Sequence, residues 1–308
     1  MDKTFFKEHT EGFLRYIATE KNLSENTVRA YKGDLDQFIA FWDGLPEQDK
    51  EHLGARQIIE RYLVSLFYKK IDKSTVARKF SCFKSFERYA QRYAQVSLDL
   101  TFKRPRLDKK LPLYLSVDEM LHLLDKVDDA QLPTAMPMRD KTILEVLYAT
   151  GVRCSELVGI RLSDIDKEAK TIRIYGKGRR ERIVLFGGKA LEKIDRYVEQ
   201  ERPRGINPSD YLFLNRNGQP LTSRSVQRIV AMFRPFIHLE RPITPHKIRH
   251  SFATHLLNQG ADLRVVQELL GHQSLASTEK YTHISLDDLA RMCDTLHPIH
   301  GLMSKERK

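Results

Sequence analysis

The chain has few cysteines and no long apolar run, and these two absences exclude whole classes of protein. Its three cysteines, Cys82, Cys154 and Cys293, are far apart and form no Cys-x-x-Cys pair, which is typical of free thiols in a reducing cytoplasm. No apolar run reaches the roughly 18 residues of a membrane-spanning helix. Residues 1–13 mix Lys, Glu and His with phenylalanine, unlike a signal peptide. We therefore expect a cytoplasmic protein without a membrane partner.

Clustered carboxylates and a complete set of metal ligands are also missing. His246 and His250 have the four-residue spacing of metal ligands, but no Glu follows His246 and no carboxylate-rich segment offers a third ligand. The sequence therefore predicts no metal and no cofactor, and it disfavours a metal-dependent nuclease. It favours structural roles for His250 and His255.

The chain does have length and positive charge. Its 308 residues exceed the size at which a chain usually folds around a single hydrophobic core, so two domains are expected. The net charge is +11 and the pI is near 9.4, which suits a polyanionic partner because each neutralised phosphate releases condensed counterions. Composition alone favours a nucleic acid partner only modestly over a basic protein that has none.

Helical patterns dominate the first ~100 residues. Ser24 is expected to cap one helix, and Ser74 to open a second. On the second helix a basic stripe recurs every four residues, away from the aromatic side. The stripe consists of Lys84, Arg88 and Arg92. It is either an ordinary solvated face or a surface that contacts DNA phosphates, and we take its members as candidate DNA-binding residues.

Residues 103–112 are predicted to be a basic linker between the two domains. They carry two prolines and five cations against one acid, and proline favours extended backbone at and before its own position. Two of the cations, Arg104 and Arg106, are further candidates for contact with the DNA backbone. The predicted domains are residues 1–102 and 113–308.

The second domain is predicted to be mainly helical with a small antiparallel β-sheet. Ser116 is a candidate N-cap. A helix over about 139–149 should stop near Gly151. Residues 171–175 and 182–186 should form a hairpin around a glycine-containing turn.

Two candidate site residues occupy turns of this domain. Arg153 lies at a break between helical segments, where its planar guanidinium suits phosphate oxygens, and Glu156 is close enough to orient it. Lys177 lies between glycines in the hairpin turn, where a lysine can donate a proton. A surface ion pair and an exposed charged turn would explain these two segments equally well.

The segment 244–250 is more specific. Thr244 is a good N-cap and Pro245 suits the first helical position. His246 and Arg249 would then share one face of a helix N-terminus, which favours an anion.

Tyr281 follows a helix-ending glycine and His272. Read alone, Tyr281 would be a half-buried packing residue, because a phenol with a pKa near 10 is a poor nucleophile at neutral pH. Attack on a phosphodiester would need a strongly cationic site, and the other candidate segments provide one.

As a set, these residues resemble the motifs of the tyrosine recombinase (phage integrase) family. The matching residues are Arg153, Lys177, the His246-x-x-Arg249 pair, Leu270-Gly271-His272 and Tyr281. Their order and spacing match over the C-terminal ~200 residues, and the N-terminal region resembles the family's SAM-like core-binding domain. The resemblance implies a helical core-binding domain and an α/β catalytic domain that together form a C-shaped clamp around DNA.

The resemblance also implies a mechanism that uses neither metal nor ATP. Tyr281 would attack the scissile phosphate, giving a 3′-phosphotyrosyl bond and a free 5′-hydroxyl. Arg153, Arg249 and His272 would neutralise charge on the non-bridging oxygens. Lys177 would protonate the departing 5′ oxygen, and His246 would help to transfer the phenol proton.

Within the family the chain resembles the bacterial Xer branch, and XerC more than XerD. The segments 151–157, 176–178 and 281–284 carry the first resemblance, and residues 139–141 with Leu289-Ala290 carry the second. This implies double-stranded DNA with a dif-like site, a second XerD-like recombinase in a heterotetramer on two sites, and an FtsK-like septal DNA translocase as partners. The implied task is conversion of chromosome dimers to monomers for segregation at cell division.

A further segment, 286–296, has apolar residues at helical spacing. In the family such a helix docks onto the neighbouring protomer, whereas packing within its own chain is the alternative.

Besides the metal-dependent nuclease disfavoured above, two other functions compete with a recombinase. A DNA-binding regulator explains the charge but requires no tyrosine behind Leu-Gly-His and no Gly-Lys-Gly turn. A type IB topoisomerase uses similar chemistry, although the two-part layout and short chain favour a recombinase. Integration of a mobile element is the alternative to chromosome-dimer resolution.

Overall fold

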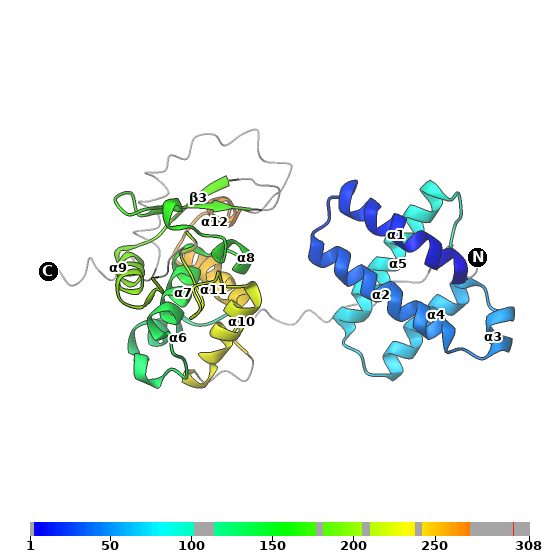
Figure 1. Ribbon diagram of the computed structural model, residues 1–308, viewed down its shortest axis with the longest axis horizontal. Coiled ribbons are helices and arrows are strands. Elements are labelled where there is room, and N and C mark those ends of the chain that lie inside the picture. The colour runs from blue at the N-terminus through cyan, green and yellow to red at the C-terminus, as the bar shows by residue number, and fades with distance from the viewer. Residues whose placement is uncertain are drawn as a thin grey trace. The chain divides into compact units, whose positions relative to one another are not determined.

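The computed structural model describes residues 3–101, 114–176, 181–204, 210–237 and 242–271, together with Pro298. The chain divides into two units, Met1–Leu111 and Pro112–Lys308 (Figure 1). The predicted linker 103–112, with Arg104 and Arg106, lies outside the described residues.

The described residues of the N-terminal unit form five helices. They are α1 (Lys3–Thr19), α2 (Glu25–Asp43), α3 (Glu47–His52), α4 (Ala55–Tyr68) and α5 (Lys73–Tyr93). Ser24 caps α2 as predicted, since its side chain accepts from the backbone N–H of Thr27. The prediction for α5 was two residues late: Asp72 is the N-cap, and its carboxylate accepts from the N–H of Ser74.

Aromatic rings fill the core of the N-terminal unit. The rings of Phe6 and Phe86 stack with their centroids 4.8 Å apart, and Phe38 meets Phe83 edge to face at 5.0 Å. These contacts join α1, α2 and α5, so the aromatic side of α5 is committed to packing and leaves the basic stripe on the opposite side.

The C-terminal unit surrounds a three-stranded sheet with helices. Its helices are α6 (Val117–Leu121), α7 (Pro137–Thr150), α8 (Cys154–Leu157), α9 (Gly188–Arg196), α10 (Ser223–Met232), α11 (Pro245–Asn258) and α12 (Leu263–Leu270). Shorter 3₁₀ and π turns are η1 (His122–Lys126), η2 (Asp129–Gln131), η3 (Leu162–Asp164), η5 (Tyr197–Glu201) and η6 (Arg234–Phe236). Ser116 caps α6 as predicted, in a reciprocal pair with Glu119.

The sheet is antiparallel with strand order β1-β2-β3. Its strands are β1 (Ile165–Asp166), β2 (Thr171–Tyr175) and β3 (Glu181–Leu185). The predicted hairpin is confirmed, with Ile174 opposite Arg182 in its register. Because alternate residues share a face, Arg182 lies on the same side of β3 as the buried Val184.

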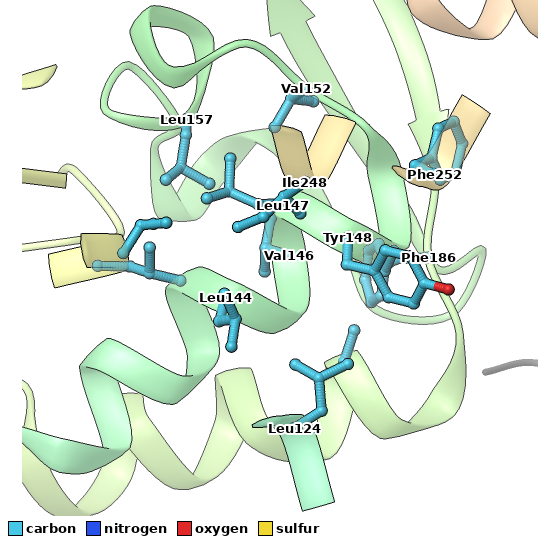
Figure 2. Close-up of a cluster of buried hydrophobic side chains, with 14 of the residues drawn as sticks. Leu124, Leu144, Val146, Leu147, Tyr148, Val152, Leu157, Phe186, Ile248 and Phe252 are labelled. Atoms are coloured by element: carbon cyan, nitrogen blue, oxygen red, sulfur yellow. The ribbon is translucent and has the colours of Figure 1, made fainter. Parts of the chain in front are cut away.

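Helix α7 is the centre of the C-terminal unit. Figure 2 shows Leu144, Val146 and Leu147 of this helix pointing in different directions into a cluster that includes Ile248 and Phe252 of α11. A helix buried on all sides must satisfy its polar side chains internally. The helix ends at Gly151, as predicted. Because α7 is packed on all sides, this end is also fixed in position.

Two buried polar contacts tie α7 to its neighbours. The carboxylate of Glu145 pairs with Lys193 of α9. The hydroxyl of Tyr148 lies 2.6 Å from Nδ1 of His255, which is buried on α11 and has the structural role expected for it. No helix in the described part of the chain is long and apolar enough to cross a membrane.

Candidate active site

Arg153 follows the end of α7 and is the N-cap residue of α8. After Gly151 the chain is extended at Arg153, whose backbone N–H donates to Oε2 of Glu156 at 2.7 Å. The guanidinium Nη1 donates to Oε1 of the same carboxylate at 2.9 Å. The side chain is 43% exposed, so a charged face stays open to solvent while Glu156 holds the other.

Glu156 is an enclosed carboxylate with two cationic partners. Its side chain is 4% exposed, and Arg182 of β3 donates to both of its oxygens, at 2.9 and 2.8 Å. Burial by itself would raise the pKa of Glu156, but the hydrogen bonds from Arg182 and Arg153 outweigh burial and lower it to about 2. At neutral pH Glu156 is therefore an anion hydrogen-bonded to Arg153, and its supporting role in the reaction stays a prediction.

Arg249 is a buried cation on α11. It is 7% exposed, and its two terminal nitrogens donate to the carbonyl oxygens of Gly151 and Leu270. Burial, followed by the repulsion of Arg153, lowers the pKa of Arg249 to about 10, and the attraction of Glu156 opposes this. The guanidinium is thus still charged at neutral pH, beside the cation of Arg153.

Glycines end both helices that supply these carbonyls. Gly151 has φ +61° and Gly271, after α12, has φ +63°. A Cβ at Gly151 would lie 2.5 Å from a ring carbon of Phe252, so only glycine allows both the left-handed turn and the close approach.

The C-terminal end of α12 is bound by three arginines in succession. Arg182 Nε donates to the carbonyl of Leu269 at 3.4 Å, Arg249 donates to that of Leu270, and Arg153 Nη2 donates to that of Gly271 at 3.3 Å. These bonds join four segments of the chain. The last carbonyls of a helix lack intrahelical partners and carry its negative end, so cations are favourable there. The backbone that leads into the predicted His272 is therefore held by three guanidiniums.

Arg182 was not among the predicted site residues. The signal was present, because Arg182 shares its strand face with Val184 and an arginine on an inward face needs an acidic partner. That partner, Glu156, lies 26 positions earlier, and periodicity alone does not pair the two.

Of the four remaining predicted catalytic residues, the structure describes only His246. Thr244 caps α11 and Pro245 opens it, as predicted. His246 lies exposed in the first turn of α11, whereas Arg249 one turn later is buried. Lys177, His272 and Tyr281 lie outside the described residues, as does the predicted helix 286–296.

The predicted DNA-binding stripe on α5 has unequal members. Lys84 donates to Glu87 at 3.0 Å and to the carbonyl of Leu100, so it ties α5 to the segment that follows it. Arg92 lies 3.5 Å from Glu20 and is 61% exposed. Arg88 is exposed. Contact of these three with DNA stays a prediction.

The described residues contain no group of three or more His, Cys, Asp or Glu side chains arranged to hold a metal ion. The four-residue spacing of His246 and His250 therefore does not extend to a third ligand within this part of the chain. Cys82 and Cys154 are free thiols.

Comparison with known proteins identifies the class to which this site belongs. Residues 114–287 match the Phage integrase family, and residues 10–93 match the N-terminal SAM-like domain of phage integrases. The chain therefore belongs to the phage integrase family, the tyrosine recombinases, which are enzymes that cut and rejoin DNA strands. The predicted fold class, mainly helical with a small antiparallel sheet and a SAM-like N-terminal domain, is confirmed.

The curated relatives are Xer recombinases. The chain is 37% identical over 294 residues to tyrosine recombinase XerD of Staphylococcus haemolyticus, covering 94% of this chain and 98% of that protein. It is 38% identical, with the same coverage, to XerD of Staphylococcus aureus strain Mu50. The Xer branch is thus supported, but the finer likeness to XerC is not supported by these names.

Solved structures agree with the fold. XerH recombinase bound to its difH substrate in a pre-cleavage complex has a TM-score of 0.64 at 23% identity, covering 92% of this chain and 82% of that one. The Tn1549 transposon integrase in complex with transposon right-end DNA has a TM-score of 0.64 at 18% identity, covering 92% and 96%. At these identities the likeness establishes the fold alone.

Proposed function

We propose that this chain is a site-specific recombinase that cuts and rejoins DNA at a dif-like site through a 3′-phosphotyrosyl bond to Tyr281. The observation that carries the proposal is the pair of guanidiniums on Arg153 and Arg249. Both donate to the backbone at the end of α12, just before His272 in the sequence, and the pKa of about 10 keeps Arg249 charged at neutral pH although it is buried. Two adjacent cations, one of them open to solvent, suit the non-bridging oxygens of one phosphate.

The proposed reaction exchanges one phosphate ester for another. The phenolic oxygen of Tyr281 bonds to phosphorus as the bond from phosphorus to the 5′ oxygen breaks. His246 accepts the phenol proton, and Lys177 gives a proton to the departing 5′ oxygen. Arg153, Arg249 and His272 stabilise the charge that develops on the phosphoryl oxygens. A 5′-hydroxyl from another strand then reverses the step and rejoins the DNA, so the bond energy is conserved.

The proposed partners are those that the resemblance to the Xer branch implies. The chain would act with a second Xer recombinase in a heterotetramer on two DNA sites, each protomer closing its two domains around DNA as a C-shaped clamp. The segment 286–296 would dock onto the neighbouring protomer, and an FtsK-like translocase would control the exchange. The proposed task is resolution of chromosome dimers at cell division. Relatives named XerD favour the XerD role for this chain over the XerC role.

The chemistry is tested with a suicide substrate that is nicked beside the scissile phosphate. A covalent protein–DNA adduct should form in the presence of chelator and without ATP, and Tyr281→Phe should abolish it. Tyr68→Phe, at an exposed position on the N-terminal unit, is the matched control and should keep full activity. An adduct with the Tyr281 variant would remove the nucleophile from the proposal, and binding without any adduct would favour a regulator.

The partner is tested by incubating two dif-like sites with this chain alone, with an XerC-type protein and with an XerD-type protein. Strand exchange only with the XerC-type partner supports the XerD role. Exchange only with the XerD-type partner supports the XerC role. Recombination by this chain alone would contradict the heterotetramer.

The general-acid role of Lys177 is tested separately. Lys177→Ala should lose cleavage of an ordinary substrate and regain it with a 5′-phosphorothiolate, because the sulfur leaving group needs no proton. Failure of the sulfur substrate to restore cleavage would assign the proton to another group.

A further inference from the structure

Arg182 of β3 contacts two other elements of the candidate site, α8 and the end of α12. Two of its nitrogens donate to the carboxylate of Glu156 on α8, and Nε donates to the carbonyl of Leu269 at the end of α12. Its side chain is 17% exposed, so these contacts are largely shielded from water. Lys177, which lies outside the described residues, is five positions before Arg182 in the sequence.

We propose that Arg182 is a positioning residue of the recombination reaction, which holds Glu156 and the end of α12 so that Arg153 and the turn before His272 are in place when the scissile phosphate arrives. This inference rests on the proposed function, whose phosphate-binding residues it supports.

The first argument is the sharing of Glu156. Oε1 accepts from Nη1 of Arg153 and from Nη1 of Arg182, both at 2.9 Å. Oε2 accepts from the backbone N–H of Arg153 at 2.7 Å and from Nη2 of Arg182 at 2.8 Å. Each carboxylate oxygen thus serves both arginines, and the bidentate geometry fixes the plane of the carboxylate against which Arg153 is set.

The second argument is charge. Arg153 and Glu156 alone form a neutral pair, which offers a phosphate little net attraction. With Arg182 the three groups carry one net positive charge, and Arg182 satisfies the carboxylate while the exposed face of Arg153 stays available. Removing Arg182 would leave Arg153 as the sole side-chain partner of an enclosed carboxylate, so the carboxylate that sets the orientation of Arg153 would itself be poorly held.

The third argument is the contact with the turn. A Cβ at Gly271 would lie 3.2–3.3 Å from three atoms of the Arg182 side chain, so Arg182 packs closely against this glycine. Gly271 directly precedes His272 in the chain, and its left-handed backbone sets the direction in which the chain leaves α12. A shift of Arg182 would therefore move the backbone of Gly271, which directly precedes His272, the second predicted phosphate ligand in this region.

The alternative is that Arg182 only stabilises the fold as a buried ion pair between β3 and α8. In that case its loss would lower the folded fraction without changing the chemistry of the folded enzyme. A positioning role predicts instead that folded variants bind DNA and cut it slowly.

The test compares Arg182→Met, Arg182→Lys and the control Arg173→Met in the full chain. Arg173 lies exposed on the neighbouring strand β2. Three quantities are measured below the unfolding midpoint of each variant: the single-turnover rate of adduct formation on a saturating suicide substrate, the Kd for uncut DNA in the Tyr281→Phe background, and the folded fraction. For Arg182→Met we expect adduct formation to slow about 10- to 100-fold with less than about 3-fold change in Kd. Arg182→Lys should recover part of the rate, and Arg173→Met all of it.

A pH profile separates positioning from folding. Three charged groups face Glu156. Arg153 at the start of α8 and Arg182 of β3 donate hydrogen bonds to it, and Arg249 of α11 attracts it electrostatically. Without Arg182, burial should raise the pKa of Glu156 into the measurable range, and protonation would release Arg153. The adduct rate of Arg182→Met should therefore fall as the pH drops from about 7 to about 5. Wild type and the double variant Arg182→Met/Glu156→Gln should lack this added fall.

Each outcome decides the inference. Arg182→Met rates that follow only the folded fraction, or a profile identical to wild type, would overturn it. If Arg182→Met does not fold, Arg182→Lys with the rate and affinity of wild type would overturn it as well. Absence of an adduct with the wild-type chain would instead refute the proposed function, so the two failures are distinguishable.

Discussion

The guanidinium of Arg249 donates to the carbonyl of Gly151, which lies 98 positions earlier in the chain. The bond joins the middle of α11 to the end of α7, and the second donor of Arg249 joins both to the end of α12. A buried cation must be satisfied by acceptors, and a helix that ends in a left-handed glycine presents a carbonyl with no partner in its own helix. The predicted phosphate ligand and the helix-ending turns therefore stabilise one another.

Replacement of Gly151 by alanine should destabilise the protein strongly. The left-handed backbone and the 2.5 Å approach of the new Cβ to Phe252 both oppose the change. We expect a loss of about 2–5 kcal/mol in the free energy of unfolding, measured by denaturant titration. Gly218→Ala is the matched control, because Gly218 has φ +76° and a Cβ there would meet no atom within 4 Å, so it should lose only about 1–2 kcal/mol. Equal losses would contradict the role of close packing at Gly151.

Arg249→Lys should impair catalysis more than DNA binding. Lysine keeps the charge, but its single ammonium cannot replace the planar guanidinium. The guanidinium donates to the carbonyls of Gly151 and Leu270 at once and is proposed to bind a phosphate as well. We expect adduct formation on the suicide substrate to fall by about 10²–10³, with Kd changed far less. Arg196→Lys, at an exposed position on α9, should behave like wild type. A normal adduct rate in Arg249→Lys would remove Arg249 from the site.

The anion of Glu156 should make stability depend on acid pH. Its folded pKa of about 2 lies below the ordinary value of 4.5, so its contribution is present above about pH 4.5 and is lost as the pH falls toward 2. A shift of this size corresponds to about 3 kcal/mol. The difference in unfolding free energy between wild type and Glu156→Gln should therefore be large at pH 6 and shrink toward zero near pH 2. A difference that does not change with pH would refute the ion-pair account; Glu168→Gln, at an exposed position, should show little difference at either pH.

The stability of the protein should depend on the Lys193 ammonium, because its partner Glu145 on α7 is fully buried. Lys193 pairs with one oxygen of Glu145, and the other oxygen has no hydrogen-bond partner in the described residues. Lys193→Met should lower the free energy of unfolding by about 3–5 kcal/mol at neutral pH, and Lys193→Met/Glu145→Gln should recover part of this loss.

The single variant Lys193→Met should be more stable at pH 5 than at pH 8. Burial raises the pKa of Glu145, so the folded protein takes up a proton there as the pH falls and relieves the unpaired charge. Denaturant titrations of Lys193→Met at the two pH values provide the measurement. Greater stability at pH 8 would show that Glu145 is not the group responsible.

Arg88 and Lys84 should differ in their effect on DNA binding. Arg88 is exposed, whereas Lys84 binds Glu87 and the carbonyl of Leu100. If α5 faces DNA phosphates, Arg88→Gln should reduce the slope of log affinity against log salt by about 1, and Lys84→Gln should change it less. Titrations at several salt concentrations give both slopes. An unchanged slope for Arg88→Gln would exclude Arg88 from the DNA surface.

Local signals predicted the elements of this fold well. Ser24, Ser116 and Thr244 each cap the helix that follows, because a capping side chain acts on backbone groups within three residues of itself. The start at Ser74 was wrong for the same reason: Asp72 is an equally local acceptor, and it accepts from the N–H of Ser74. The hairpin could be predicted because alternation on both strands and a glycine-containing turn are short-range features.

The sequence by itself determined the class of protein, the helix caps, the hairpin and the identity of Arg153, Glu156 and Arg249 as candidates, since all of these follow from residue types, short spacings and motif order. Only the tertiary structure decided how the candidates combine. It buried Arg249, opened one face of Arg153 and brought in Arg182, because these outcomes depend on which segments, up to 118 positions apart, pack against the end of α12. Charge and periodicity identify the groups, but the free energy of burying a guanidinium is set by acceptors that only the folded chain supplies.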